Sequence, residues 1–228
     1  MPKTMKYYQP HLLPHLLTIY YFFIASSSVY LYSNGRIFDI SHRYIPALPV
    51  APTQHEEQFT YQQLRVQATC AHRDFDAPCH VFDDYFYVGF DCDQLDLDIL
   101  NGHAIVVDVP RDTNITAEVM KSLNIPKGTR RVLFKTLNTD SFVGFTEDGA
   151  KWVVENTDIK LVGTDYFSIA TYDEAIPAQH VVFLKGKEII PVQGLKLDGI
   201  QPGNNSVHCL PLRLLGADGA PTRCILIK

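Results

Sequence analysis

The sequence predicts an α/β fold with a mixed sheet, and two observations carry that prediction. In the middle of the chain, a β-branched strand over residues 104–109 is followed by a helix and then by a strand over residues 131–136. Such a strand–helix–strand unit joins parallel neighbours. The ends of the chain are rich in strand patterns, which indicates mixed or antiparallel additions to the same sheet.

Composition and charge narrow the class of protein. The chain has 228 residues, enough for one domain or for a domain with appendages. Hydrophobic residues make up 46% and charged residues 20%, which is typical of globular proteins and excludes a disordered tail or a collagen-like fibre. The formal net charge of −5 provides no basic surface, so we expect no nucleic-acid partner.

The first 27 residues have the pattern of a secretory signal peptide. Lys3 and Lys6 precede a short apolar run over residues 16–24, and small residues follow it from Ala25 onward. The run is too short to span a bilayer, which needs about 20 apolar residues. An uncleaved hydrophobic tail is the alternative. We therefore expect residues 1–27 to be a signal peptide, with a secreted domain over residues 35–228 and no membrane span after cleavage.

Export would expose cysteines and asparagines to modification. Five cysteines are present, and an odd number in an oxidising compartment leaves at least one thiol free or paired between chains. Most of them are expected to be buried apolar side chains, although Cys70 and Cys79 could form a disulfide. Two triplets that begin at Asn114 and Asn204 match the glycosylation sequon, which predicts a glycoprotein.

The first helix has clear starting signals. Thr116 is suited to cap it, Glu118 lies in its first turn, and Ile115 and Met120 occupy the positions of a hydrophobic staple. A second helix is expected from about residue 146 to residue 156, because acidic residues fill its first turn.

The other elements are expected to be strands. A lysine–glycine–lysine turn over residues 185–187 predicts a hairpin between two of them. Residues 46–63 are rich in proline and glutamine, and we expect a loop or an extended arm there. The remaining strands are expected over residues 160–163, 180–184, 188–192, 207–215 and 223–227.

One segment contains residue types suited to catalysis. Potential metal ligands and proton carriers gather there: Cys70, His72, Asp74, Asp76, Cys79 and His80. Asp76 and His80 flank an alanine–proline pair, and a carboxylate close to an imidazole suits a divalent transition metal with a general base beside it. The alternative is that the segment forms only a turn.

Several stretches of the chain resemble the cyclase family, which includes bacterial kynurenine formamidase and isatin hydrolase, and in particular its plant cyclase-like proteins. The resemblance covers roughly residues 35–50 and 74–227, and residues 51–73 fit poorly. The matching stretches are residues 35–44, Asp108-Val109-Pro110-Arg111-Asp112, Leu137-Asn138-Thr139-Asp140, residues 194–199 and residues 206–213.

The resemblance carries expectations about fold and activity. It implies a swivelling β/β/α fold, a homo-oligomer, and hydrolysis of an amide bond in a small-molecule substrate with zinc or manganese. For the plant branch it further implies localisation to the extracellular space or extracellular matrix, and a role in restraining stress and cell-death responses.

Three residues match the functional positions of the family. Asp76 matches the metal-bridging aspartate, His80 the catalytic acid/base and His180 a later metal ligand. Cys70 and Asp74 stand where the two leading histidine ligands belong.

The departures leave several readings open. A cysteine thiolate and a carboxylate can both bind zinc, and residues 70, 74 and 76 share the parity of one strand face. Gln193 stands where a glutamate ligand is expected, which disfavours a second metal. One hypothesis is a metal-dependent hydrolase, and the other is a degenerate, metal-free member that acts by binding or regulation. A third is that residues 51–74 do not reflect the true coding sequence.

Overall fold

The structure is a computed structural model. It describes residues 35–42, 75–76, 83–87, 91–136, 143–166, 168–171, 173, 178, 182–186, 188–215, 217 and 219–228. The chain divides into two compact units, Met1–Arg36 and Ile37–Lys228, and nearly all described residues belong to the second. None of the helices in the described part of the chain has the length and apolar character that a bilayer crossing requires.

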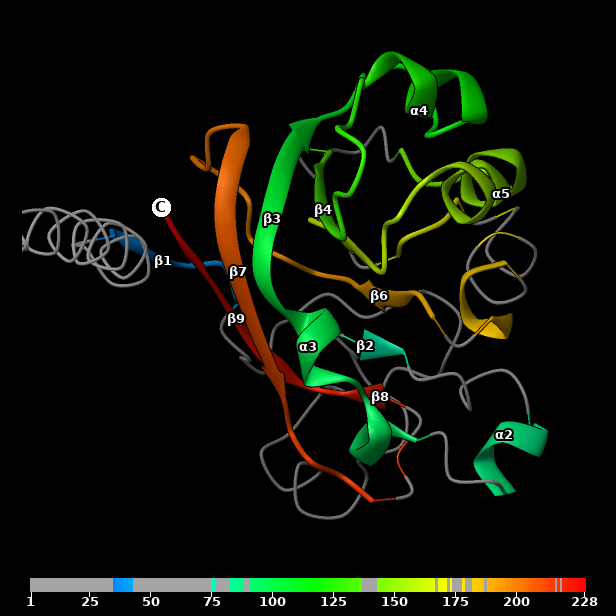
Figure 1. The fold of residues 1–228 in the computed structure, drawn as a ribbon, viewed down its shortest axis with the longest axis vertical. Helices are drawn as coiled ribbons and strands as arrows, with labels where there is room; N and C mark the ends of the chain where they lie inside the picture. The colour runs from blue at the N-terminus through cyan, green and yellow to red at the C-terminus, as the bar shows by residue number, and fades with distance from the viewer. Residues whose placement is uncertain are drawn as a thin grey trace, which may run out of the picture. The chain divides into compact units, whose positions relative to one another are not determined.

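A single nine-stranded sheet organises the described residues, with the order β1-β9-β7-β3-β4-β5-β6-β2-β8 (Figure 1). Its strands are β1 (Ile37–Asp39), β2 (Phe75–Asp76), β3 (Asn101–Asp108), β4 (Arg131–Lys135), β5 (Leu161–Thr164), β6 (Ile190–Val192), β7 (Gly203–Pro211), β8 (Gly219–Ala220) and β9 (Thr222–Ile227).

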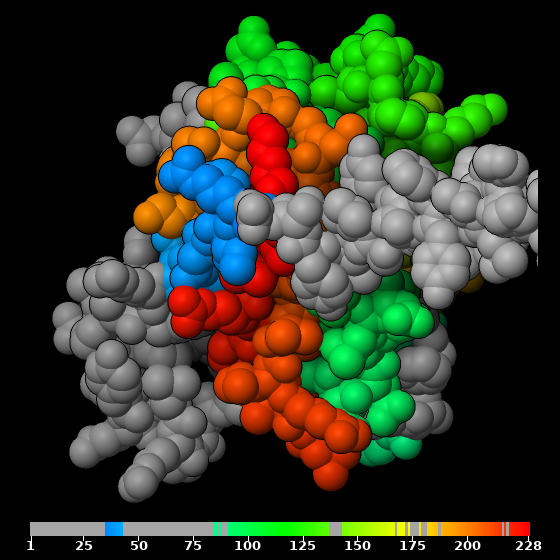
Figure 2. Space-filling model, turned by 60° about the vertical axis from the view of Figure 1, so that its left-hand side comes forward, coloured from blue at the N-terminus to red at the C-terminus, as the bar shows by residue number. Residues whose placement is uncertain are grey.

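The sheet is mixed, as the sequence predicts. The central strands β3, β4, β5 and β6 pair in parallel. On one side, β7, β9 and β1 add antiparallel strands, and Figure 2 shows β1 in blue, β9 in red and β7 in orange side by side. On the other side, β2 pairs antiparallel with both β6 and β8. The prediction of an α/β fold with a mixed sheet is confirmed.

Two of the helices follow the capping signals in the sequence. The helix α4 (Ala117–Ser122) begins after Thr116, whose hydroxyl accepts the N–H of Val119 at 3.2 Å. The helix α5 (Glu147–Asn156) begins after Thr146, whose hydroxyl instead donates to Asp148 Oδ1 at 2.6 Å. Asp148 Oδ2 accepts the N–H of Ala117 at 3.0 Å, so this one carboxylate connects the starts of both helices.

Three short helices complete the described elements. They are α2 (Asp83–Tyr87), the 3₁₀ helix Cys92–Gln94 and α3 (Leu97–Leu100).

Strand β4 separates two hydrophobic clusters, and each of its residues is buried. Leu133 packs in a cluster with residues of β3, β6, β7 and β9. Val132 and Phe134 pack on the opposite face with residues of α4 and α5. In that second cluster Phe145 stacks edge-on against Phe134, with ring centroids 5.1 Å apart, and against Phe183 at 5.3 Å.

The predicted strand over residues 180–184, and the hairpin with residues 188–192, are wrong where the structure describes them. Residues 182–184 have π-helical backbone, and only Ile190–Val192 form a strand, β6. Because β6 is parallel to β5, the chain between them must cross over rather than turn back. A short apolar run fits a buried helix as well as a strand, so the sequence pattern could not separate the two.

Two cysteines that were expected to be simple apolar side chains form a disulfide. Cys209 of β7 and Cys224 of β9 are directly opposed, with their Cα atoms 4.2 Å apart. The N–H of Cys224 donates to the hydroxyl of Ser41, and its carbonyl accepts the N–H of Ile40. These bonds point away from β7, so the two cysteines are a non-hydrogen-bonded pair, the kind in which opposed residues come closest. Cys92 is also buried.

Candidate functional site

The predicted site residues lie mainly outside the described part of the chain. Cys70, Asp74, His80 and His180 all fall there. Asp76 is described only through its backbone, as the second residue of β2. The catalytic role of His80 and the metal-binding roles of the other four therefore stay predictions.

Strand β2 brings Asp76 to the inside of the sheet, between β6 and β8 (Figure 1). Phe75 pairs with Val192, the last residue of β6, and Asp76 pairs with Gly219 of β8. Gln193 follows Val192 directly. The register thus places the backbone of Asp76 on the strand next to β6. Gln193, which follows β6, stands at the position where the family resemblance expects a glutamate.

A second contact joins the chain that follows each predicted histidine. Tyr85 lies in α2, which begins three residues after His80, and its hydroxyl donates to the carbonyl of Lys185 at 3.0 Å. Lys185 directly follows the π-helical residues 182–184, five residues after His180. The sequence analysis did not single out Tyr85, because nothing local in the sequence marks a contact that spans 100 positions.

Gln193 is the only one of the expected ligand positions whose side chain is described. It is 7% exposed, and its Oε1 accepts the N–H of Ile169 at 3.0 Å. An amide is neutral, and the Gln193 amide already accepts a backbone hydrogen bond. It is therefore poorly suited to replace the carboxylate ligand that a second metal ion would need. Within the described ranges, no group of three or more histidine, cysteine, aspartate or glutamate side chains could hold a metal ion.

Next to this position, a buried carboxylate joins the ends of two central strands. Asp165 follows β5, and its Oδ1 accepts the N–H of Thr136 at 2.7 Å and the Thr136 hydroxyl at 2.6 Å. Asp165 and Thr136 are both only 3% exposed. They fix the carboxyl edge of β4 and β5, the edge at which ligands bind in open α/β sheets. Sequence analysis missed this pair, although a polar residue directly after a buried strand is a recognisable signal.

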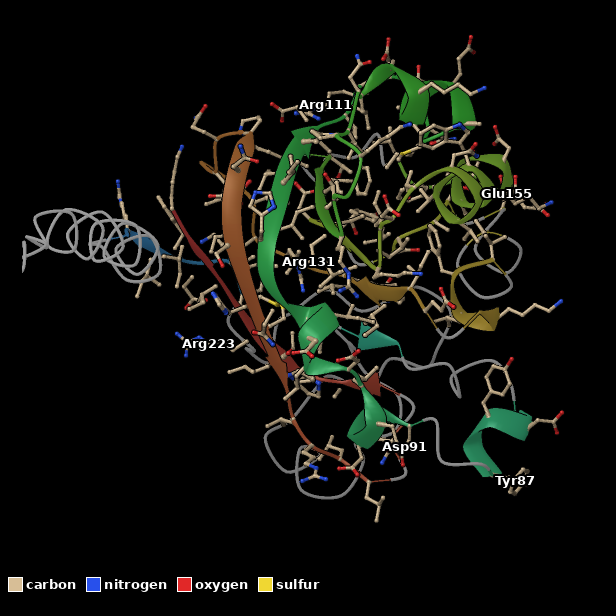
Figure 3. All side chains as sticks on the ribbon, viewed as in Figure 1. Tyr87, Asp91, Arg111, Arg131, Glu155 and Arg223 are labelled. Carbon is tan, nitrogen blue, oxygen red and sulfur yellow. A yellow bond between two sulfur atoms is a disulfide. The ribbon has the colours of Figure 1, made fainter. Side chains whose placement is uncertain are left out.

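The two buried cations of β4 are bound to backbone carbonyls. Arg131, labelled in Figure 3, donates to the carbonyls of Ile99 at 2.7 Å, His103 at 3.3 Å and Asp98. Burial lowers the pKa of the Arg131 guanidinium, because desolvation disfavours its charged form. Lys135, at the other end of β4, donates to the carbonyl of Ile200 at 2.8 Å. Both side chains therefore stabilise the scaffold around the candidate site.

Comparisons with known proteins agree with this architecture. A family model described as "Putative cyclase" matches residues 38–171. The chain is 53% identical over 225 residues to Cyclase-like protein 1 of Arabidopsis thaliana, and the match covers 87% of each protein.

Matches extend to bacterial relatives and to solved structures. The chain is 31% identical over 215 residues to kynurenine formamidase of Salinibacter ruber, which covers 83% of this chain and 96% of that protein. A solved structure described as a potential metal-dependent hydrolase with cyclase activity superposes with a TM-score of 0.69 at 26% identity, and covers 85% of this chain and 98% of the other. The family model spans more than half of the sequence, so the chain belongs to the cyclase family.

Proposed function

We propose that this protein is a secreted, metal-dependent hydrolase that cleaves a C–N bond other than a peptide bond in a small-molecule amide or cyclic substrate. The observation that carries the proposal is the pairing of β2 with β6, which joins Asp76 to the strand leading into position 193. The Tyr85–Lys185 hydrogen bond supports it, since it connects the chain just beyond His80 and His180.

The proposed roles follow from the chemistry of each side chain. Asp76, Asp74, Cys70 and His180 would supply oxygen, sulfur and nitrogen ligands for one zinc or manganese ion. Such an ion would polarise the carbonyl of the substrate and make a water molecule more acidic. His80 would take a proton from the attacking water and return it to the leaving nitrogen.

The relatives support an amide substrate. One relative is named kynurenine formamidase, and a solved structure of the same fold is described as a potential metal-dependent hydrolase. An arylformamidase-like reaction on a small amide is therefore the first activity to test.

The Cys209–Cys224 disulfide supports an extracellular location. Disulfides persist in oxidising compartments, which agrees with the signal pattern in residues 1–27. Asn204 is exposed at the start of β7 and would be available to a glycan. The proposal therefore includes a glycosylated protein of the extracellular space or matrix, present as a homo-oligomer, with a role in stress or cell-death responses.

A second candidate is a catalytically degenerate family member that acts by binding or regulation. The amide of Gln193 favours it, because this position carries no charge and is already hydrogen-bonded. Such a protein would retain the family fold without needing an ion.

The deciding experiment combines metal content and hydrolysis. Purified protein is measured by inductively coupled plasma mass spectrometry and assayed on an N-formyl aromatic amine, with Asp76→Ala and His80→Ala as test variants. Asp108→Ala and His103→Ala are matched controls, since both residues are exposed on β3.

About one ion per chain, lost in Asp76→Ala but not in Asp108→Ala, together with hydrolysis lost in both test variants, supports the hydrolase. Folded wild-type protein that is metal-free and inactive favours the second candidate.

A further inference from the structure

We propose that Gln193 is a structural brace. Its side chain fastens the end of β6 to the backbone at Ile169 by a hydrogen bond, without a metal ion. The cyclase-family resemblance expects a glutamate metal ligand here, and this chain has a glutamine that binds its own backbone instead. The inference goes beyond the proposed function, because it concerns how β6 is fastened, and it applies equally to an active and an inactive protein.

The geometry assigns the side chain of Gln193 to the backbone of a neighbouring segment. Gln193 leaves β6 and is 7% exposed, and Ile169 is fully buried. The 3.0 Å bond from the Ile169 N–H to Gln193 Oε1 therefore lies where water cannot replace the acceptor. Loss of that acceptor would leave a buried donor unpaired, which costs more than the bond itself contributes.

The brace completes a row of buried backbone contacts. Ile115 bridges to Phe145, and Phe145 bridges to Ala170, in parallel. The N–H of Phe145 donates to the carbonyl of Ile169 at 2.9 Å, while the N–H of Ile169 donates to Gln193. Both backbone polar groups of Ile169, its N–H and its carbonyl, are thus hydrogen-bonded. The row connects the entry to α4, the entry to α5 and the exit from β6.

The same side chain is poorly suited to a divalent ion. Zinc and manganese sites draw on thiolates, imidazoles and carboxylates, which offer charge or a strong nitrogen donor. The Gln193 amide brings no charge to offset desolvation of an ion. The structure therefore assigns this position to the scaffold, and any metal bound by this chain would be held without it.

The test compares two substitutions of Gln193 with one matched control. Gln193→Met has a similar length but no acceptor, whereas Gln193→Glu retains one. Gln201→Met is the control, because Gln201 is exposed. Each full-length protein is measured for melting temperature, for hydrogen exchange of the peptide that contains Ile169, and for ions per chain after dialysis against zinc or manganese.

The expected result is specific to a brace. Gln193→Met lowers the melting temperature by about 5 °C, a shift of the size expected for one unsatisfied buried donor in a domain of this length. It accelerates exchange at Ile169 about tenfold, with no change in ions per chain. Gln193→Glu keeps the protection of Ile169, and Gln201→Met changes nothing.

Two outcomes would overturn the proposal. One is a Gln193→Met protein with unchanged exchange at Ile169, and the other is a loss of bound ions in that variant. Should Gln193→Met fail to fold, the Gln193→Glu protein decides: retained protection of Ile169 supports the brace, and lost protection refutes it. If the proposed hydrolase function is wrong, the wild-type protein will be inactive in the hydrolysis assay. That result does not change the melting temperatures or the hydrogen exchange measured here.

Discussion

Removing the Cys209–Cys224 disulfide should lower stability by an amount that the structure sets. The bond closes a loop with a sequence separation of 15, and the chain-entropy model assigns about 3 kcal/mol to such a loop. A domain of this length loses about 2–4 °C of melting temperature per kcal/mol, which gives a decrease of about 6–12 °C for the cross-link alone.

Replacing the cysteines removes both the cross-link and buried side-chain contacts, because both cysteines are buried in the hydrophobic cluster with Leu133. The measurement must therefore separate these two contributions to the free energy of unfolding. We would compare Cys209→Ala/Cys224→Ala with Cys92→Ala by urea unfolding. Cys92 is suited as a control, since it is buried at 3% exposure and lies outside the Cys209–Cys224 cross-link. The cross-link contribution is the loss in the double variant minus twice the loss in Cys92→Ala.

A second signature should accompany the loss of stability. Without the cross-link, the unfolded chain expands and exposes more surface, so the dependence of the unfolding free energy on urea should steepen. A double variant whose loss is no larger than twice that of Cys92→Ala would refute the reasoning. So would non-reducing peptide mapping that recovers Cys209 and Cys224 as thiols.

Two further predictions concern the contact between α4 and α5. Gly149→Ala should destabilise the fold by about 3 kcal/mol or more, because the new Cβ would lie 1.9 Å from the carbonyl oxygen of Ile115; Gly186→Ala, which meets no atom within 4 Å, should be nearly neutral in the same thermal melts. The Thr146 hydroxyl holds the pKa of Asp148 below its ordinary value. The stability that this carboxylate provides is therefore present above the unfolded pKa near 3.8 and is lost as pH falls through the lower folded value. Asp148→Asn should remove this part of the acid dependence. An unchanged dependence of the unfolding free energy on pH, measured from pH 2 to pH 6, would contradict this prediction.

Local signals were sufficient for the centre of the fold and insufficient for its long-range pairings. The strand before α4 and the cap at Thr116 could be predicted, because both depend on neighbours in the sequence. The disulfide could not, since the pairing of Cys209 with Cys224 requires the register of β7 on β9. The helical conformation of residues 182–184 could not be predicted either, because a short apolar run fits a buried helix as well as a strand.

The candidate site shows the same division. The residue types predicted for it rest on the motif around Asp76 and on the family resemblance, and they stay predictions. The hydrogen bond from Ile169 to Gln193 could not be predicted, because the sequence does not show which backbone group a glutamine side chain will contact 24 positions away. Tyr85 and Asp165 likewise acquire their roles from partners that lie far away along the chain or across two strand ends.

The pairing of β1 with β9 has a consequence for the order of folding. The first described strand has its neighbour in the last one, with Ile37 opposite Ile227. During synthesis, residues 37–39 must therefore wait for about 190 further residues before their partner exists, and contacts of such large sequence separation slow folding. A nascent chain halted before β9 would leave β1 unpaired and β7 as an open edge, so its interaction with chaperones should persist until residue 227 has been made.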